Sequence, residues 1–303
     1  MNSKGSLNLK RIMRLSRIIL IIAVVCSLVV PLAVAMSMTA ARHHHPQTTW
    51  AKPGHKPLSD KEAAAQVAHV PEVRPTNRPY NNYYPSAAQL HAFYTTTGGR
   101  YHKTSVQENP LNAYVTGHDH LKNPSTDDLI QWAAHKWGIP ENVMRAQTSF
   151  ESLWFQNWGG DLSTVSHADY WRYPAQFRES DWRVWQSIGI AQIKWVPGSS
   201  LGVGTEPLRW LSTAFNVDYL GATIRYYYDG RCRWCKPGYR SKQPWLSIGG
   251  WNRPQPWLNG RQWFYIGKVK SDLAHRAWLN FKTDQTFSPS LRRFWNNDRW
   301  NTQ

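Results

Sequence analysis

The segment TSFESLW, from Thr148 to Trp154, places one carboxylate, Glu151, beside a serine and between aromatic side chains. Glu151 is predicted to lie at the C-terminal end of a helix, where the negative end of the helix dipole disfavours an ionised carboxylate. Neighbouring rings such as that of Phe150 desolvate the group further. Both effects raise the pKa of a carboxyl group, as a general acid working at neutral pH requires. Taken alone, a glutamate at a helix end is ordinarily a solvated surface charge.

Four other segments change that interpretation because of their order along the chain. SIGIAQI follows, with Gly189, Gln192 and Ile193, and FNVDYLGATIRYYYDG comes next, with an Asn before the pair that begins at Tyr219. SIGGWN ends at Asn252, and YIGKVKSDL closes the series. Together with IPENVMRAQTSFESLWFQ, these segments resemble the catalytic domain of lytic transglycosylases and goose-type lysozymes. Each motif is weak singly, but five in the family's order, over about 160 residues, make the resemblance specific.

The resemblance implies a lysozyme-like α+β fold that is mostly helical and has a substrate cleft. It implies no cofactor, and a substrate that is the β-1,4 bond between MurNAc and GlcNAc in peptidoglycan glycan strands. Glu151 then corresponds to the general acid/base, and Ser152 orients the glutamate or the substrate. The residues that the resemblance assigns to substrate binding are Ser152, Gln192, Ile193, Trp251, Asn252 and Tyr219.

The chain departs from the family pattern in two places. The family's Ala-Tyr-Asn is here Gly250-Trp251-Asn252, followed by RPQP, so a tyrosine hydroxyl is absent. The stretch between Glu151 and Gln192 is longer than in most members and contains further acids. With one carboxylate, Glu151 protonates the glycosidic oxygen and then takes the proton of the muramyl 6-hydroxyl, which gives a 1,6-anhydro end.

A second carboxylate would change the chemistry. At roughly 6.5–9.5 Å from Glu151 it could activate a water on the opposite sugar face, giving hydrolysis with inversion. Asp161 and Asp169 are the candidates for that role. We favour transglycosylation, a lyase reaction, over this glycosidase (muramidase) alternative.

Composition leaves two non-enzymatic hypotheses open. The chain of 303 residues has 18 Trp, 14 Tyr and 9 Phe, and a formal charge of +17. Exposed rings stack on flat ligands, so a non-catalytic glycan-binding protein of the cell wall is one alternative. The charge favours polyanions such as anionic cell-wall polymers or lipid, and a membrane-surface protein is the other alternative. Nucleic acid is disfavoured because no DNA- or RNA-binding signature is present.

The N-terminus predicts export. Basic residues between Lys4 and Arg17 precede an uncharged run from Ile18 to Ala41 with the small-residue site Ala33-Val34-Ala35. Residues 1–41 are therefore either a cleaved signal peptide or a retained membrane anchor. In both cases we expect an extracytoplasmic protein, secreted or anchored to the cell membrane, with the basic flank in the cytoplasm.

Two cysteines, Cys232 and Cys235, form the motif CRWC. No second pair of Cys or His stands at zinc-binding spacing, so no metal site is predicted. In an exported chain, a small loop disulfide is the favoured interpretation and a redox dithiol the alternative.

Several elements must position these residues. Residues 42–120, rich in Pro, Asn and His, are predicted to be a largely irregular linker with a short helix near SAAQLHAFYTTTGG. Apolar stripes and caps predict helices over 125–137, 140–154, 206–230, 243–252 and 261–281. The stretch 159–186 is loop-like. The catalytic domain is expected at 121–282, followed by a tail at 283–303.

Overall fold

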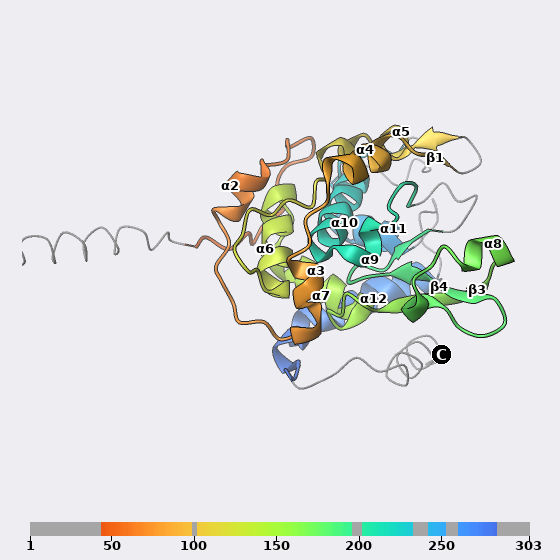
Figure 1. Cartoon of the computed structure of the whole chain (residues 1–303). Coiled ribbons are helices and arrows are strands. Elements are labelled where there is room, and N and C mark those ends of the chain that lie inside the picture. Colours follow the sequence, from red (N-terminus) through yellow and green to blue (C-terminus); the bar gives the residue numbers. More distant parts are fainter. Residues whose placement is uncertain (1–43, 99–101, 196–201, 233–241, 253–259, 284–303) are drawn as a thin grey trace, which may run out of the picture. The chain divides into compact units, whose positions relative to one another are not determined.

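The computed structural model describes residues 44–98, 102–195, 202–232, 242–252 and 260–283 (Figure 1). From His45 onward the chain forms one compact unit. This unit is α+β and mostly helical, as predicted. Its helices are α2 (Asp60–Ala64), α3 (Arg78–Asn81), α4 (Ala87–Thr95), α5 (Ser105–Glu108), α6 (Thr126–Trp137), α7 (Glu141–Ser152), α8 (His167–Tyr170), α9 (Leu208–Leu211), α10 (Thr213–Tyr228), α11 (Pro244–Asn252) and α12 (Gly260–His275). The 3-10 helices are η1 (Pro75–Asn77), η2 (Pro110–Tyr114), η3 (Ala175–Phe177) and η4 (Ala277–Asn280).

The strands form two small antiparallel sheets. One pairs β1 (Thr97–Gly98) with β2 (Lys103–Thr104). The other has the order β3-β4-β5, from β3 (Gly159–Thr164), β4 (Arg183–Ile188) and β5 (Ile193–Lys194).

Helix α6 begins and ends as its sequence predicts, and α7 begins where predicted but ends at Ser152, before the predicted end at residue 154. Ser125 caps α6 through a capping box with Asp128, and Gly138 ends the helix in the left-handed conformation, at φ 59. Helix α7 begins after Pro140. The two helices pack against each other, and α10 packs against α6 and α11, while α12 packs against α7. Trp132 and Trp137 lie in this core and are fully buried.

The predicted continuous helix over 206–230 is interrupted. Ser212 has an extended conformation (φ -127, ψ 119) and its hydroxyl accepts a hydrogen bond from the backbone N–H of Phe215. A serine hydroxyl competes with the helical backbone for hydrogen bonds, so it favours a cap over a helix interior. The chain therefore turns between the short helix α9 and the long helix α10.

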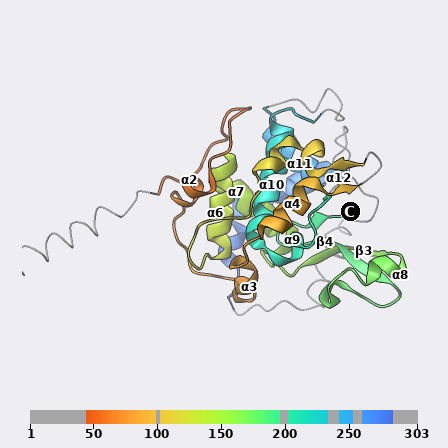
Figure 2. The same ribbon diagram turned by 45° about the horizontal axis from the view of Figure 1, so that its top comes forward.

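The prediction of a loop over 159–186 was wrong in part. Residues at both ends of this stretch pair as β3 and β4, and Gly160 lies opposite Ser187. A second hydrophobic cluster supports the hairpin, with Phe177, Val184 and Ile188 at its centre. Figures 1 and 2 both place α8 at the outer end of the β3–β4 hairpin.

The prediction of a linker over 42–120 was also wrong for the described residues. From His45 onward this segment belongs to the compact unit, and Phe93, Leu111 and Val115 are buried in its core. The short helix predicted near SAAQLHAFYTTTGG is α4.

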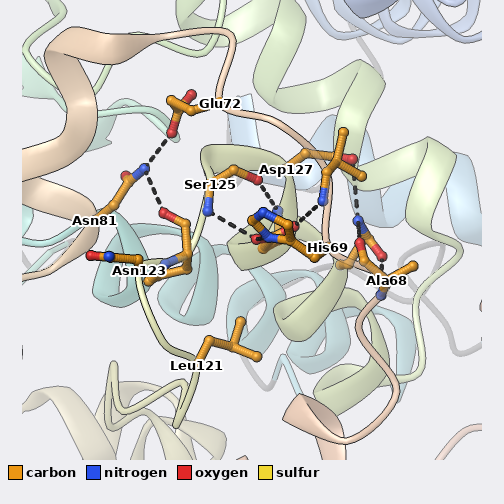
Figure 3. Close-up of polar contacts among 12 residues, drawn as sticks. Ala68, His69, Glu72, Asn81, Leu121, Asn123, Ser125 and Asp127 are labelled. Carbon is orange, nitrogen blue, oxygen red and sulfur yellow. Dashed lines mark hydrogen bonds and ion pairs between the residues drawn. The ribbon is translucent and has the colours of Figure 1, made fainter. Parts of the chain in front are cut away.

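Side-chain hydrogen bonds attach this segment to the N-terminal end of α6 (Figure 3). Asp128 accepts the backbone N–H of Val70 at 2.8 Å and contacts His69 Nδ1 at 2.7 Å. Glu72 accepts the backbone N–H of Thr126 at 2.8 Å and the Asn81 amide at 2.7 Å. Bonds of this kind need no apolar periodicity, so the sequence pattern did not reveal an ordered segment.

Three predictions fall on residues outside the described ranges. The signal or anchor segment 1–41 lies outside them, and so does the tail 283–303 except for Thr283. Cys235 is also outside, whereas Cys232 is buried and disulfide-bonded. Among the described helices, none combines the length and apolar character that a membrane crossing requires.

A buried carboxyl group gives a testable pH dependence. Burial raises the pKa of Asp119 to about 6 from its usual 3.8, although hydrogen bonds from the Leu121 backbone and Tyr84 oppose the shift. Because the folded protein binds this proton more tightly than the unfolded chain does, the protonated Asp119 contributes to the free energy of unfolding. This contribution is fully present below about pH 3.8 and is lost as the pH rises through about 6. As the pH is raised from 4 to 7, the thermal midpoint of Asp119→Asn should therefore rise relative to that of wild type, because asparagine does not titrate. A difference that stays constant over this range contradicts the prediction.

Candidate active site

Glu151 lies in the last turn of α7 and is 6% exposed. The hydroxyl of Tyr265, on α12, donates a hydrogen bond of 2.6 Å to Glu151 Oε1. The amide of Gln147, one turn earlier on α7, donates to the same hydroxyl at 3.1 Å. Because Gln147 and Tyr265 are both fully buried, this chain of hydrogen bonds fixes the orientation of the Glu151 carboxyl group.

The turn after Glu151 is held by the segment that was predicted to be a linker. Leu153 and Trp154 both have left-handed backbones, at φ 52 and φ 66, a conformation that costs about 1–2 kcal/mol for a residue with a side chain. Arg74 Nε donates to the Leu153 carbonyl at 2.8 Å, and the Asn77 amide donates to the Trp154 carbonyl at 2.6 Å. These bonds keep the end of α7 in place.

Ser152 connects Glu151 to the predicted glycan-binding turn. Its hydroxyl donates to the Ile190 carbonyl at 2.9 Å. Within that turn Gln192 has φ 57, and its amide donates to the Gly189 carbonyl at 2.9 Å. Gly189 has φ 91 and packs against Asn216, so a side chain at this position would be both strained and blocked. Ser152 and Gln192 thus belong to one rigid unit.

Of two further predicted residues, Trp251 contacts the same turn and Tyr219 packs against Trp251. Trp251, on α11, donates its indole N–H to the Ala191 carbonyl at 3.1 Å. The ring of Tyr219, on α10, meets Trp251 edge to face with centroids 6.1 Å apart. Burial raises the pKa of Tyr219 to about 12, so its hydroxyl stays protonated at neutral pH. Asn252 follows Trp251 at the end of α11 and is half-buried.

Other predicted residues have mainly packing contacts. Ile193 is 1% exposed and belongs to the hydrophobic core. Trp154, which closes the TSFESLW segment, is likewise buried, and its indole N–H donates to the Arg145 carbonyl. Trp195 is half-buried, and the Arg172 guanidinium lies 5.2 Å from its ring centroid.

The structure places the two candidate second carboxylates at different points of the hairpin. Asp161 is on β3, next to Gly160, whose backbone approaches the side chain of Gln192. Its carboxylate accepts a 2.6 Å hydrogen bond from Ser187 and lies 3.2 Å from Lys194 Nζ. Asp169 is on α8 and caps that helix with Ser166. Asp161 is therefore the candidate that lies beside the Gln192 turn.

The sequence did not reveal the residues that hold Glu151 in place. Tyr265 was recognised only as part of a helix motif, and Gln147 only as a member of one helix face. The i, i+4 spacing places Gln147 and Glu151 on one helix face, but the tyrosine that bridges them comes from a helix far away in the sequence. Arg74 and Asn77 lay in a segment without any periodic pattern.

Comparisons of the chain with protein-family models, with curated proteins and with solved structures found no match.

Tyr265→Phe tests the contact to Glu151. The variant keeps the ring, which packs edge to face on Phe150 at 5.3 Å, but it loses the hydroxyl that bonds Glu151. With glycan as the substrate, as the motif resemblance implies, kcat should fall about 10- to 100-fold with little change in KM, because the carboxyl group is less well oriented. Steady-state kinetics on soluble glycan fragments would measure this. An unchanged kcat contradicts a role for the contact.

Proposed function

We propose that this protein is an exported lytic transglycosylase that cleaves the β-1,4 bond between MurNAc and GlcNAc in peptidoglycan. The observation that carries the proposal is the short hydrogen bond from Tyr265 to Glu151 at the end of α7. It orients a single buried carboxyl group, and Ser152 joins that group to the turn containing Gln192. The family is inferred from the order of the five motifs along the chain. Export is inferred from the basic residues and the apolar run at the N-terminus.

In the proposed reaction Glu151 acts first as an acid and then as a base. It donates its proton to the glycosidic oxygen as the bond from that oxygen to C1 of MurNAc breaks. The resulting carboxylate then removes the proton of the 6-hydroxyl while O6 bonds to C1. Glu151 regains its proton, no water is consumed, and the product ends in a 1,6-anhydro sugar. The hydrogen bond from Tyr265 to Oε1 favours the transferable proton on Oε2.

A muramidase is the second candidate, and the position of Asp161 favours it. Asp161 is exposed and lies on the strand beside the Gln192 turn, so it could activate a water. Its carboxylate accepts a hydrogen bond from Ser187 and lies 3.2 Å from Lys194 Nζ, which fixes its position on β3. In this reaction Glu151 is the acid and Asp161 the base, and the product has a reducing end.

Mass spectrometry of the products separates the two. The chain from residue 42 onward would be incubated with purified peptidoglycan, in parallel with Asp161→Asn and Asp169→Asn. Anhydro-muropeptides from all three proteins support the transglycosylase. Reducing ends that disappear only with Asp161→Asn support the muramidase. If wild type releases nothing from a substrate that a control muramidase digests, both proposals are wrong and a non-catalytic glycan-binding protein is favoured.

A further inference from the structure

Two of the large hydrophobic side chains that are exposed lie together on the β3–β4 hairpin. Trp171 is 59% exposed and Trp182 is 44% exposed. Trp171 directly follows α8, and Trp182 directly precedes β4. With His167 and Tyr170 of α8 they form a cluster of rings, here called the hairpin platform. Helix α8 lies at the outer end of the hairpin (Figures 1 and 2).

The rings of the hairpin platform are held in place although they face solvent. The Arg178 guanidinium lies 4.7 Å from the Trp171 ring centroid, and the Trp171 indole N–H is 3.3 Å from His167 Nε2. The Trp182 ring meets His167 and Tyr170 with centroid distances of 4.4 Å and 5.2 Å. Rings fixed in this way lose little conformational entropy when a ligand stacks on them.

The backbone at Trp182 is unfavourable for so large a residue. Asp181 and Trp182 both have left-handed conformations, at φ 58 and φ 57. The turn is nevertheless retained, and the Trp182 carbonyl accepts the backbone N–H of Val165 at 3.0 Å. Strain that the surrounding structure maintains, on a residue whose side chain is exposed, points to a function for that side chain.

The charges of the hairpin argue against an anionic ligand. Residues 159–195 contain four acids and four bases, Asp161, Asp169, Glu179, Asp181, Arg172, Arg178, Arg183 and Lys194, whereas the whole chain has a formal charge of +17. Arg172 lies 3.4 Å from Asp169 and 3.6 Å from Glu206, and Lys194 pairs with Asp161. A locally neutral surface with paired charges gives an anionic membrane little electrostatic attraction.

We propose that the hairpin platform binds the sugar rings of an uncharged stretch of glycan. A pyranose ring in a β-1,4-linked chain presents a face of C–H groups that stacks on an indole, whose π face is electron-rich. Its hydroxyl groups at the ring edge suit hydrogen-bonding side chains such as those of Arg172 and Asp169. Two fixed indoles and a neutral polar rim match such a ligand.

The position of the hairpin platform indicates a polymer. Strand β4 has six residues, which span about 20 Å, and runs from Trp182 towards the turn that contacts Ser152. A ligand that reaches both places must be several sugars long. This extension rests on the proposed function, which makes peptidoglycan the glycan concerned.

Binding can be measured without cleavage in the Glu151→Gln background. Trp171→Ala and Trp182→Ala would be compared with Trp263→Ala, a matched control because Trp263 is 52% exposed on α12. The assays are co-sedimentation with purified peptidoglycan and fluorescence titration with a neutral β-1,4-linked GlcNAc hexamer. We expect each platform variant to bind about tenfold more weakly, Trp263→Ala to bind like the parent, and Trp171→Phe to retain binding.

Several results would overturn the inference. The inference is wrong if the platform variants bind glycan as tightly as the parent. It is also wrong if Trp263→Ala loses as much affinity as the platform variants do. A loss of binding to phosphatidylglycerol vesicles with unchanged glycan binding assigns the platform to a membrane surface instead. Circular dichroism checks that each variant is folded. If Trp182→Ala does not fold, the glycan binding of Trp171→Ala tests the inference. If the wild-type protein releases no product but binds glycan through the hairpin platform, the proposed activity is wrong and the inference about the platform is supported.

Discussion

Glu151→Gln is expected to lower the rate of glycan cleavage by about 10³-fold, because the variant cannot donate or accept the proton that both candidate reactions require. The substitution leaves the local structure intact. A glutamine carbonyl oxygen can still accept the 2.6 Å hydrogen bond from Tyr265 that Glu151 Oε1 accepts. The side chain also keeps its size at a position that is 6% exposed. The loss should therefore appear in kcat, measured by the release of soluble muropeptides.

Glu141→Gln is the matched control, since it makes the same change in the same helix. Glu141 is buried near His135 and lies 2.9 Å from the Arg145 guanidinium. These partners lower the pKa of Glu141 despite the opposing effect of burial. This variant should lose stability yet keep its turnover at temperatures where it is folded. A Glu151→Gln protein that cleaves glycan as fast as Glu141→Gln would exclude Glu151 as the acid.

Lys136→Met is expected to lower the free energy of unfolding by about 3–5 kcal/mol, the usual effect of removing one partner of a buried ion pair. Lys136 Nζ lies 2.6 Å from Asp60 Oδ1 and 2.7 Å from Asp218 Oδ2, and its side chain is 2% exposed. Asp218 also accepts the indole N–H of Trp137 at 2.7 Å. Without the lysine, the fully buried Asp218 carboxylate lacks its nearby cation. Urea denaturation would measure the change.

The control for this prediction is an exposed lysine. Lys103 lies 4.0 Å from Glu108, and its side chain is 45% exposed. Lys103→Met should change the free energy of unfolding by less than about 1 kcal/mol. Adding Asp218→Asn to Lys136→Met should restore part of the lost stability, because the unpaired charge is removed. Equal effects of the two lysine substitutions would contradict the expected role of burial.

Local sequence signals determined the helices that carry the candidate site. Ser125 and Gly138 set the ends of α6, and Pro140 sets the start of α7, because caps and breakers act within one turn of the chain. The short helix predicted near SAAQLHAFYTTTGG is α4. The motif around Glu151 also identified Ser152, and the SIGIAQI motif identified the turn containing Gln192. The structure joins the two through the Ile190 carbonyl.

Only the tertiary structure decided how the remaining segments fold. The segment before residue 120 is ordered by hydrogen bonds that link residues far apart in sequence, such as the one that Thr126 donates to Glu72 and the one that Arg74 donates to Leu153. The pairing of β3 with β4 across a long, polar, Trp-rich connection likewise depends on the separate core around Phe177. Neither arrangement leaves a periodic pattern in the sequence.

The same distinction holds for the site. The sequence supplied Glu151, but Tyr265 bonds it from a helix more than a hundred residues later. Propensities and caps depend on neighbours within a few residues, so they specify which side chains are available. Which of these side chains meet depends on how the helices pack, because burial and the pairing of polar groups are satisfied only when distant segments come together.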